Sequence, residues 1–244
     1  MNKKDNFTKW VSSFSGFDGG DIGAPSSPSI WVCGIEWGGD VSYEWLKEEL
    51  DHGPELSPPS GYEEPEDNLS YVYNRNTAKI LAAINGLTSA DYENFALQEK
   101  LFITGQKGYF KLNLYPLPFK NTSPDRWAIW LHELTDISSK NEYIDICKKH
   151  RFHFLRELKQ THKPKIIICF GKNYKNDFIS AFGGDVIDIK EERIGDRDLY
   201  WFSSDDGIVA ICPFPTSQYG LNSNELIDAF GKRIKEISNK NVHQ

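Results

Sequence analysis

Residues 29–40 read SIWVCGIEWGGD, and this stretch sets the expected fold. The apolar run from Ile30 to Ile35 has the length of a strand, and its composition is typical of a parallel strand covered on both faces. Glu36 follows at once, between an isoleucine and a tryptophan, and two glycines come after it. A carboxylate placed directly after a buried strand, among apolar neighbours, makes this position a candidate functional site.

The composition indicates a soluble globular protein with many aromatic side chains. The chain has 244 residues, of which 39% are hydrophobic and 26% are charged. We expect a single domain over residues 1–244, because α/β domains often reach this length. No apolar run is long enough to span a bilayer, and the N-terminus lacks the apolar segment of a secretion signal. These features predict a cytoplasmic protein that does not bind membranes.

The four cysteines, Cys33, Cys147, Cys169 and Cys212, stand far apart and form no CxxC pair. This spacing excludes a zinc ribbon and the usual iron–sulfur ligand sets. We expect reduced cysteines in the core, and neither a metal nor a cofactor.

The net charge of -7 argues against a protein that coats nucleic acid by electrostatics alone, so any DNA contact must be local. Positive charge is clustered in residues 148–165, in Lys172 and Lys175, and in residues 231–235. Solvated helix faces explain each of these stretches equally well.

The order of apolar runs and breakers predicts strands separated by helices. The expected strands cover residues 30–35, 108–116, 163–172 and 207–215, with 185–189 and 199–203 as an edge hairpin. The expected helices cover about 6–16, 42–51, 74–86, 89–101 and 222–238, with a helical region over 125–162. Residues 51–68, rich in proline and acid, are expected to form an inserted exposed loop, or a lid.

This alternation predicts a three-layer αβα fold with a central, mostly parallel four-stranded sheet and a small edge hairpin. Such sheets bind ligands at the carboxyl ends of their strands. Three expected strand ends combine polar groups with glycine or proline, in the segments CGIEWGG (33–39), LNLYPLPF (112–119) and CPFPTSQYGLN (212–222). Ordinary turn chemistry explains any one of them alone.

Together and in this order, the three segments resemble the motifs of the uracil-DNA glycosylase superfamily, in particular its mismatch-specific and thymine-DNA branches. Residues 34–38, Gly-Ile-Glu-Trp-Gly, resemble the first motif, Gly-x-Asp-Pro-Tyr or Gly-Ile-Asn-Pro-Gly. Glu36 matches the residue that holds or activates the attacking water in that family. Asn113 matches the asparagine that recognises the base edge. The resemblance extends over roughly residues 28–238.

The last motif of the family, His-Pro-Ser or Asn-Pro-Ser followed by Gly-Leu-Asn, is similar to residues 214–216 and 220–222. Phe214 stands where many members have the histidine that steadies the departing base. Trp37 replaces a proline, and the insertion at 51–68 has no counterpart in the family. The acidic net charge and the missing histidine favour an alternative function, a non-catalytic nucleic-acid- or protein-binding module on the same scaffold.

The resemblance implies a monofunctional DNA glycosylase that hydrolyses the N-glycosidic bond of a flipped-out pyrimidine and leaves an abasic site. In this role Glu36 would activate water and stabilise the oxocarbenium-like sugar. Its neighbours in sequence are expected to desolvate it and raise its pKa. The alternative for Glu36 is a structural carboxylate that accepts backbone N–H bonds from the following helix.

The base-binding residues expected from the resemblance and from side-chain chemistry surround this position. Asn113 offers a donor and an acceptor to a pyrimidine edge, although an asparagine at a strand end can equally cap a turn. Trp37, Tyr43, Phe119 and Phe214 provide candidate rings in the base pocket, while rings of this kind also serve as core.

DNA contacts are expected from a second group of residues. Thr216, Ser217 and Lys172 are candidates for binding phosphates. Tyr219 or Leu221 is a candidate wedge that fills the vacated base stack. A monomer is expected.

Gly38 stands where strict uracil enzymes of the family have a tyrosine that blocks substituents on the pyrimidine C5 atom. A glycine predicts a pocket open to C5-modified bases such as thymine and hydroxymethylated or glucosylated cytosine, which suggests a role in antiviral defence. Asp18 and Asp21 are candidates for the same pocket, although a solvated turn explains both. A hydrolase of free nucleosides would share the same fold class.

Overall fold

Four parallel strands form the centre of the sheet. In the computed structural model, which describes residues 2–120, 127–183, 188–204 and 207–241, their order is β3 (Tyr109–Asn113), β2 (Ile30–Gly34), β4 (Ile166–Phe170) and β7 (Gly207–Cys212). The three strand ends expected to carry function therefore lie at one edge of the sheet, since parallel strands end on the same side.

Short antiparallel strands extend this centre on both sides, giving seven strands among the described residues. On one side β6 (Arg197–Ser204) pairs with β7, and β5 (Lys190–Ile194) pairs with β6 as an edge hairpin. On the other side β1 (Gly19–Gly20) pairs with β3. The predicted α/β fold, with a parallel four-stranded centre and an edge hairpin, is confirmed.

The first strand of that hairpin was predicted at 185–189, of which residues 185–187 lie outside the described part of the chain, while Asp188 and Ile189 belong to no strand. The strand covers Lys190–Ile194, of sequence KEERI. An edge strand with exposed side chains does not need apolar residues, so the search for an apolar run missed it.

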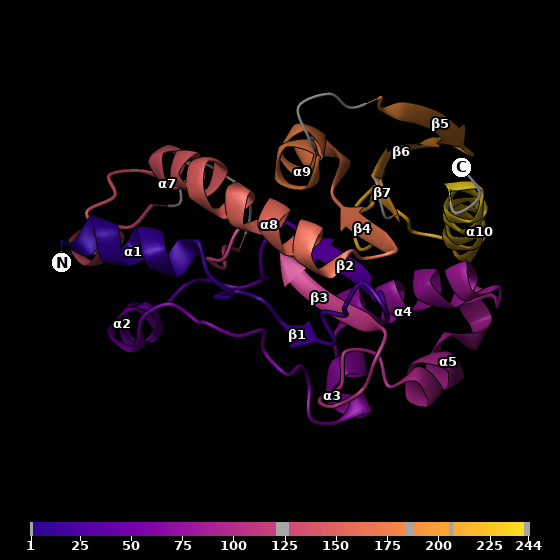
Figure 1. Cartoon of the computed structure of the whole chain (residues 1–244), viewed down its shortest axis with the longest axis horizontal. Coiled ribbons are helices and arrows are strands. Elements are labelled where there is room, and N and C mark those ends of the chain that lie inside the picture. The colour runs from indigo at the N-terminus through magenta and orange to yellow at the C-terminus, as the bar shows by residue number, and fades with distance from the viewer. Residues whose placement is uncertain (1, 121–126, 184–187, 205–206, 242–244) are drawn as a thin grey trace.

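Helices cover both faces of the sheet (Figure 1). The layer on one face contains α8 (Phe152–His162) and α9 (Lys175–Phe182), and is extended past the sheet by α1 (Lys3–Val11), α2 (Tyr43–His52), α6 (Ile129–Thr135) and α7 (Lys140–Ile146). The other face is covered by α4 (Val72–Asn85), α5 (Tyr92–Glu99) and α10 (Asn224–Asn241). These layers complete the three-layer arrangement.

The strand β2 shows why the core divides in two. Trp31 and Cys33 belong to the cluster on the α8 side, while Ile30 and Val32 belong to the cluster on the α4 side. All four are buried, as expected for a strand covered on both faces. The four cysteines are also buried and unpaired, in agreement with the sequence-based prediction.

The region predicted as helical over 125–162 consists of α6, α7 and α8, with a π-helical turn at Cys147–Arg151 between the last two. Residues 121–126 lie outside the described residues. The expected loop at 51–68 ends in a short helix, α3 (Pro65–Ser70). Its Gly-Pro-rich part is nevertheless tied to the body, since Phe14 N–H donates to Glu55 O and Gly20 N–H donates to Pro59 O.

The π-helical turn places Arg151 in the core with no exposed surface. Its guanidinium donates to five backbone carbonyls, those of Val11, Ser13, Ser15, Asn113 and Leu114. Burial lowers the pKa of Arg151 to about 10, so the group stays charged at neutral pH. These bonds join the N-terminal segment to the end of β3, which is where the candidate site lies.

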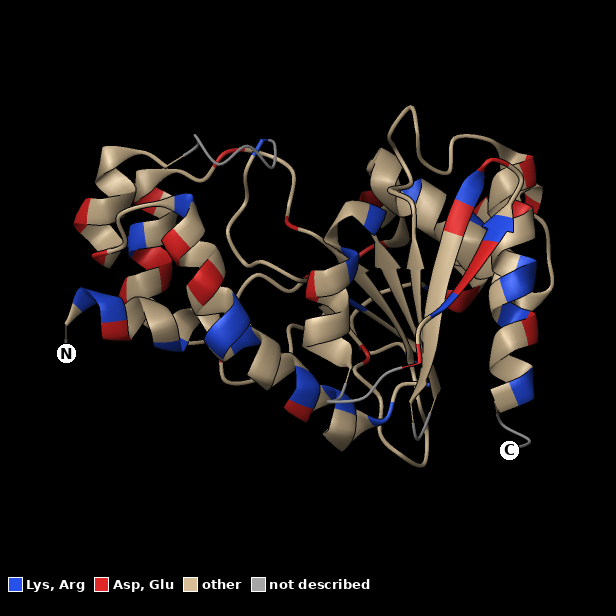
Figure 2. Cartoon of the chain, turned by 90° about the horizontal axis from the view of Figure 1, so that it is seen from above, with Lys and Arg blue, Asp and Glu red and all other residues tan. Residues whose placement is uncertain are grey.

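Charged residues of both signs are interspersed along the helices and the edge hairpin (Figure 2). The basic stretches noted in the sequence contain ion pairs, such as Lys148 with Asp177 and Arg233 with Glu192. Among the described residues, no helix is long and apolar enough to cross a bilayer.

Candidate functional site

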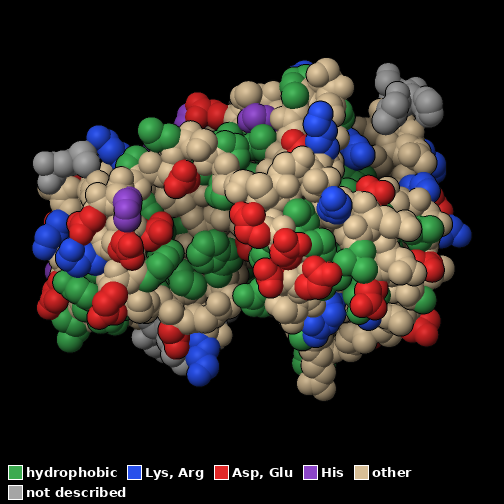
Figure 3. Space-filling model, turned by 90° about the horizontal axis from the view of Figure 1, so that it is seen from below, with side chains coloured by type: hydrophobic (Ala, Val, Ile, Leu, Met, Phe, Trp, Pro, Cys, Tyr) green, Lys and Arg blue, Asp and Glu red, His purple; other side chains and the backbone are tan. Residues whose placement is uncertain are grey.

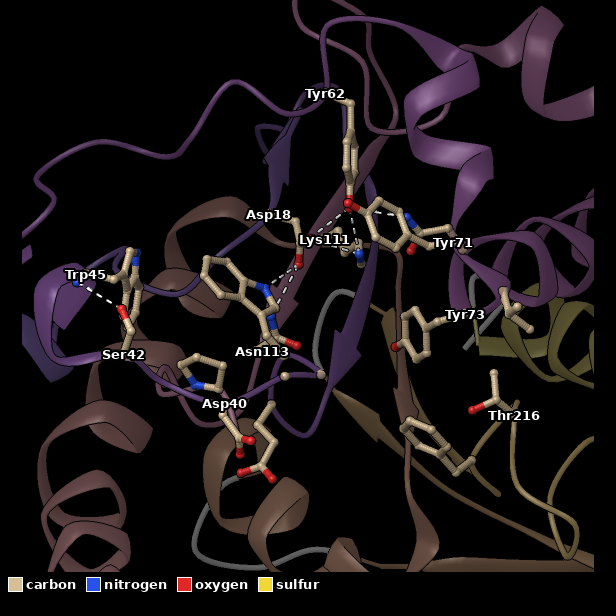
Figure 4. A pocket seen from close by; sticks show the side chains of 18 residues that line it. Asp18, Asp40, Ser42, Trp45, Tyr62, Tyr71, Tyr73, Lys111, Asn113 and Thr216 are labelled. Atoms are coloured by element: carbon tan, nitrogen blue, oxygen red, sulfur yellow. Dashed lines mark hydrogen bonds and ion pairs between the residues drawn. The ribbon is translucent and has the colours of Figure 1, made fainter. Parts of the chain in front are cut away.

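A cavity of about 720 Å³ opens at the carboxyl ends of β2 and β3. The loops after β2 and β7, the start of α4 and the segments around residues 18 and 62 contribute to its wall. The sequence-predicted residues that line it are Asp18, Glu36, Trp37, Gly38, Asn113, Phe214 and Thr216. Figure 4 shows this cavity with its polar network.

Asp18 is the centre of the polar network. One carboxylate oxygen accepts hydrogen bonds from Lys111 Nζ and from the Tyr62 hydroxyl, each at 2.9 Å. The other oxygen accepts from Trp37 Nε1 at 3.0 Å and from Asn113 Nδ2 at 3.2 Å. Asp18, with a side chain that is 12% exposed, is therefore a structural acid of the cavity wall, and the interpretation of Asp18 as part of a solvated turn is wrong.

Lys111 supplies the positive charge that Asp18 needs. Its side chain is only 8% exposed and also lies over the rings of Tyr62 and Tyr73. Burial disfavours the charged ammonium, but Asp18 and the Tyr62 hydroxyl outweigh burial and raise the pKa of Lys111 above its ordinary value. Lys111 therefore stays charged, and its salt bridge with Asp18 lies within the wall.

The Asn113 side chain is fixed by two acceptors. Its amide nitrogen donates to Gly16 O at 3.1 Å and to Asp18 at 3.2 Å. A Cβ added to Gly34 would lie 2.7 Å from Asn113 Oδ1 and 3.3 Å from the Tyr73 hydroxyl oxygen, so only glycine fits there. The expectation that Asn113 offers a ligand both a donor and an acceptor is wrong, because both N–H groups are engaged within the protein.

Glu36 lies at the end of β2 with a side chain that is 8% exposed. Its Oε2 is 3.8 Å from Lys140 Nζ, and its Oε1 is buried with no hydrogen-bond partner among the described residues. No described backbone N–H donates to it, so the alternative of a helix-capping carboxylate is wrong. Burial raises the pKa of Glu36 to about 7, and Lys140 acts in the opposite direction.

Lys140, the first residue of α7, has a side chain that is only 3% exposed. Its ammonium group lies 3.9 Å from the centre of the Phe119 ring, on the side of the sheet covered by α8. A carboxylate with a raised pKa, an unpartnered oxygen and a nearby cation can hold a water molecule and take a proton from it.

Further polar atoms of the cavity wall also have no partner among the described residues. They include the Tyr73 hydroxyl and Asn74 Oδ1, both on α4. Burial raises the pKa of the Tyr73 hydroxyl well above its ordinary value, so this group remains protonated. Figure 4 shows the Tyr73 side chain pointing toward Asn113. Buried polar groups without a partner are costly, so these two atoms destabilise the wall of the cavity as it stands.

A second cavity of about 580 Å³ shares its wall with the first at Glu36, Trp37, Gly38 and Phe214. It contains four more of the predicted residues, Phe119, Lys172, Ser217 and Tyr219. Tyr219 is 76% exposed, so its side chain is accessible to a macromolecule. Lys172 Nζ is 3.0 Å from an Asp198 carboxylate oxygen, so the positive charge of Lys172 is partly neutralised. Glu36 therefore lies between two compartments of different character.

Three predicted residues do not join these cavities. Tyr43 is the first residue of α2 and packs edge-on against Trp130, away from both cavities. Leu221 is 1% exposed in the core, so its prediction as a DNA wedge is wrong for this structure. Asp21 accepts hydrogen bonds from Ser29 Oγ and Gly108 N and braces the turn before β2.

Sequence reasoning missed Lys111, Tyr62, Tyr73 and Asn74. The place of Lys111 in the site could have been predicted from the sequence. Side chains two residues apart on a strand point to the same side, so Lys111 must share the side of Asn113. Tyr62 belongs to the inserted segment 51–68, and nothing local in the sequence indicates that it reaches Asp18. Asn74 was predicted only as the first residue of a helix, and Tyr73 was assigned to no element.

The inserted segment forms a fixed wall of the first cavity in this structure. Tyr62 contacts Asp18 and Lys111, and its backbone pairs with Phe102 and Thr104. The following acids, Glu63, Glu64, Glu66 and Asp67, are exposed. Acidic side chains gather on this face of the molecule (Figure 3). This wall repels phosphate groups and suits an uncharged ligand.

Among the described residues, no cluster of three or more His, Cys, Asp or Glu side chains is arranged to hold a metal ion. The sequence matches no protein-family model, and no curated protein matches it. The assignment of function therefore depends on the chemistry of the two cavities.

The raised pKa of Glu36 makes stability depend on pH. Between pH 4.5 and 7 the unfolded chain loses this proton first, so ionisation of the buried carboxylate destabilises the folded state as pH rises. Relative to the wild type, Glu36→Gln should gain about 3 kcal/mol in free energy of unfolding between pH 4 and pH 8. Denaturant titrations at several pH values measure this, with Glu48→Gln on the surface of α2 as the control. A difference that stays constant with pH contradicts the account.

Proposed function

We propose that this protein is a DNA glycosylase that hydrolyses the N-glycosidic bond of a flipped-out pyrimidine, with Glu36 as the group that activates water. One observation carries the proposal. Glu36 and Asn113, which come from the ends of two adjacent parallel strands, line the same cavity, and each has one oxygen without a partner among the described residues. The resemblance of the strand-end motifs to the uracil-DNA glycosylase superfamily supports the same function.

In the proposed reaction the bond between C1′ and the base nitrogen breaks, and its electron pair leaves with the base. The oxygen of a water molecule held by the Glu36 carboxylate bonds to C1′, and Glu36 takes the proton that the water loses. Glu36 then releases this proton, which neutralises the departed anionic base. The carboxylate also stabilises the positive charge that develops on the sugar. A pKa near 7 suits a base that must accept a proton and release it again near neutral pH.

The two cavities suggest how the nucleotide is placed. The base would enter the first cavity, toward Asn113, while the sugar reaches Glu36 at the shared wall. The neighbouring phosphates would lie in the second cavity, beside Ser217, Lys172 and Tyr219. The acidic segment flanks the first cavity only, so the polynucleotide approaches from the other side, where phosphates meet less repulsion.

The size of the first cavity supports a base with a substituent on C5. A Cβ added to Gly38 meets no atom within 4 Å, and the backbone at Gly38 does not have a positive φ. Gly38 therefore borders open space where a bulky residue would fill the cavity. Hydroxymethylated or glucosylated cytosine fits such a site, and defence against viruses that carry modified DNA is the corresponding proposed role.

Cleavage of modified DNA tests the proposal directly. Duplex oligonucleotides with C5-modified pyrimidines should acquire alkali-labile abasic sites, at a rate that rises with pH through about 7 because Glu36 must be ionised. Glu36→Gln should keep DNA binding and lower the cleavage rate by about 10²- to 10⁴-fold. If the wild type binds these duplexes and cleaves none of a broad panel of modified bases, the protein is not a glycosylase.

Filling the space beside Gly38 should change the choice of base. Gly38→Tyr should reduce cleavage of duplexes with a C5 substituent by at least about 10-fold relative to matched duplexes without one, since the ring occupies the volume that the substituent needs. Gly38→Ala, which adds a single methyl group in open space, is the control. An equal loss on both kinds of duplex would show that Gly38 does not border the substituent.

A non-catalytic binding module on the same scaffold is the second candidate. It is favoured by Phe214, which lines both cavities where a histidine would assist the departing base. A module predicts binding without cleavage in the wild type. A hydrolase of free nucleosides, in contrast, predicts activity on monomers that is insensitive to salt, whereas DNA binding weakens as salt rises.

A further inference from the structure

The hydrogen bonds of Asn113 determine which side of its amide faces the cavity. Its two partners, Gly16 O and an Asp18 carboxylate oxygen, can only accept, so the NH₂ group must point toward them. The carbonyl oxygen Oδ1 is then left to face the cavity, and no described residue donates a hydrogen bond to it. The amide cannot rotate by 180° without placing an oxygen against the Asp18 carboxylate.

Asn74 has the same polarity. Its nitrogen donates to the Tyr62 hydroxyl at 3.2 Å and to Asn68 O at 3.0 Å, and its Oδ1 is buried without a partner among the described residues. Tyr62 in turn donates its own hydrogen to Asp18. Asp18 thus organises two amides of residues that line the cavity. The Asn113 amide presents its oxygen to the cavity, while Asn74 Oδ1 is buried behind the wall.

A base that enters this cavity meets an acceptor at Asn113 Oδ1. An exocyclic amino group donates a hydrogen to this acceptor, while a carbonyl group at the same ring position faces it with its own lone pairs. Cytosine-type and uracil-type bases differ in this respect at C4, where the first carries an amino group and the second an oxygen. The substituent at C5 is independent of this difference.

We propose that Asp18 is a specificity-determining residue, which locks the Asn113 amide with its carbonyl toward the cavity and so selects bases with a 4-amino group over bases with a 4-oxo group. Asp18 does not touch the reacting atoms and acts by positioning Asn113. This inference rests on the proposed glycosylase function and adds to it the chemical class of the base.

The test compares two duplexes that differ only at C4, one with 5-hydroxymethylcytosine and one with 5-hydroxymethyluracil. The wild type should cleave the amino base at least about 10-fold faster. Asp18→Asn should reduce this ratio to within about 3-fold, because a neutral amide at position 18 can donate to Asn113 Oδ1 and allow the Asn113 amide to turn. A merely structural role would lower both rates and leave their ratio unchanged.

Asp21→Asn is the matched control, because it makes the same substitution in the same segment but at a residue outside both cavities. This variant should retain the wild-type ratio of the two cleavage rates. Binding of both duplexes to Glu36→Gln gives a second measurement of the preference if Asp18→Asn does not fold. Equal or faster cleavage of 5-hydroxymethyluracil by the wild type overturns the inference and leaves the glycosylase function standing. Failure to cleave either duplex, or any other modified base, overturns both.

Discussion

The hydrogen bonds that converge on the Asp18 carboxylate hold the candidate site together. Four side chains, from β3, from the loop after β2 and from the inserted segment, donate to its two oxygens. Without this acid, Lys111 would be a buried cation with no counter-ion, and the amide of Asn113 would lose the partner that orients it. Breaking such a buried pair by removing one member is strongly destabilising, by about 3 to 5 kcal/mol. The site and the stability of this edge of the sheet therefore depend on the same contacts.

Arg151 supports this arrangement from the core. It binds the carbonyl of Asn113 itself and those of the segment that leads to Asp18, so the main chain on both sides of the Asp18–Asn113 hydrogen bond is fixed by one guanidinium. Glu36 is less constrained. Its Oε2 lies 3.8 Å from Lys140 Nζ, which is beyond hydrogen-bond distance, and its Oε1 has no partner among the described residues. A rigid recognition side next to an incompletely paired acid is the arrangement expected when a base is held in place and a carboxylate acts on water.

The layers and the parallel centre of the sheet could be predicted because strands such as Ile166–Phe170 are continuous apolar runs between helices. The positions of Glu36 and Asn113 in one cavity followed from the rule that parallel strands end at one edge. Tyr62, which binds Asp18, and Lys140, which lies beside Glu36, could not be predicted, because they reach the site through loop and helix packing that leaves no periodic signal. Leu221 and Tyr43 were misplaced for the same reason, since exposure of a side chain after a turn depends on tertiary packing. The KEERI edge strand was missed because pairing, rather than hydropathy, defines it.

The central claim is that the cavity at the strand ends receives an everted base beside Glu36. A crystal structure of Glu36→Gln bound to a duplex with one 5-hydroxymethylcytosine tests it most directly. The account predicts that this base lies in the cavity, with its amino group within hydrogen-bond distance of Asn113 Oδ1 and its C1′ next to the side chain at position 36. A complex in which the base remains stacked in the duplex and the DNA lies on another face, with the cavity empty, would contradict it.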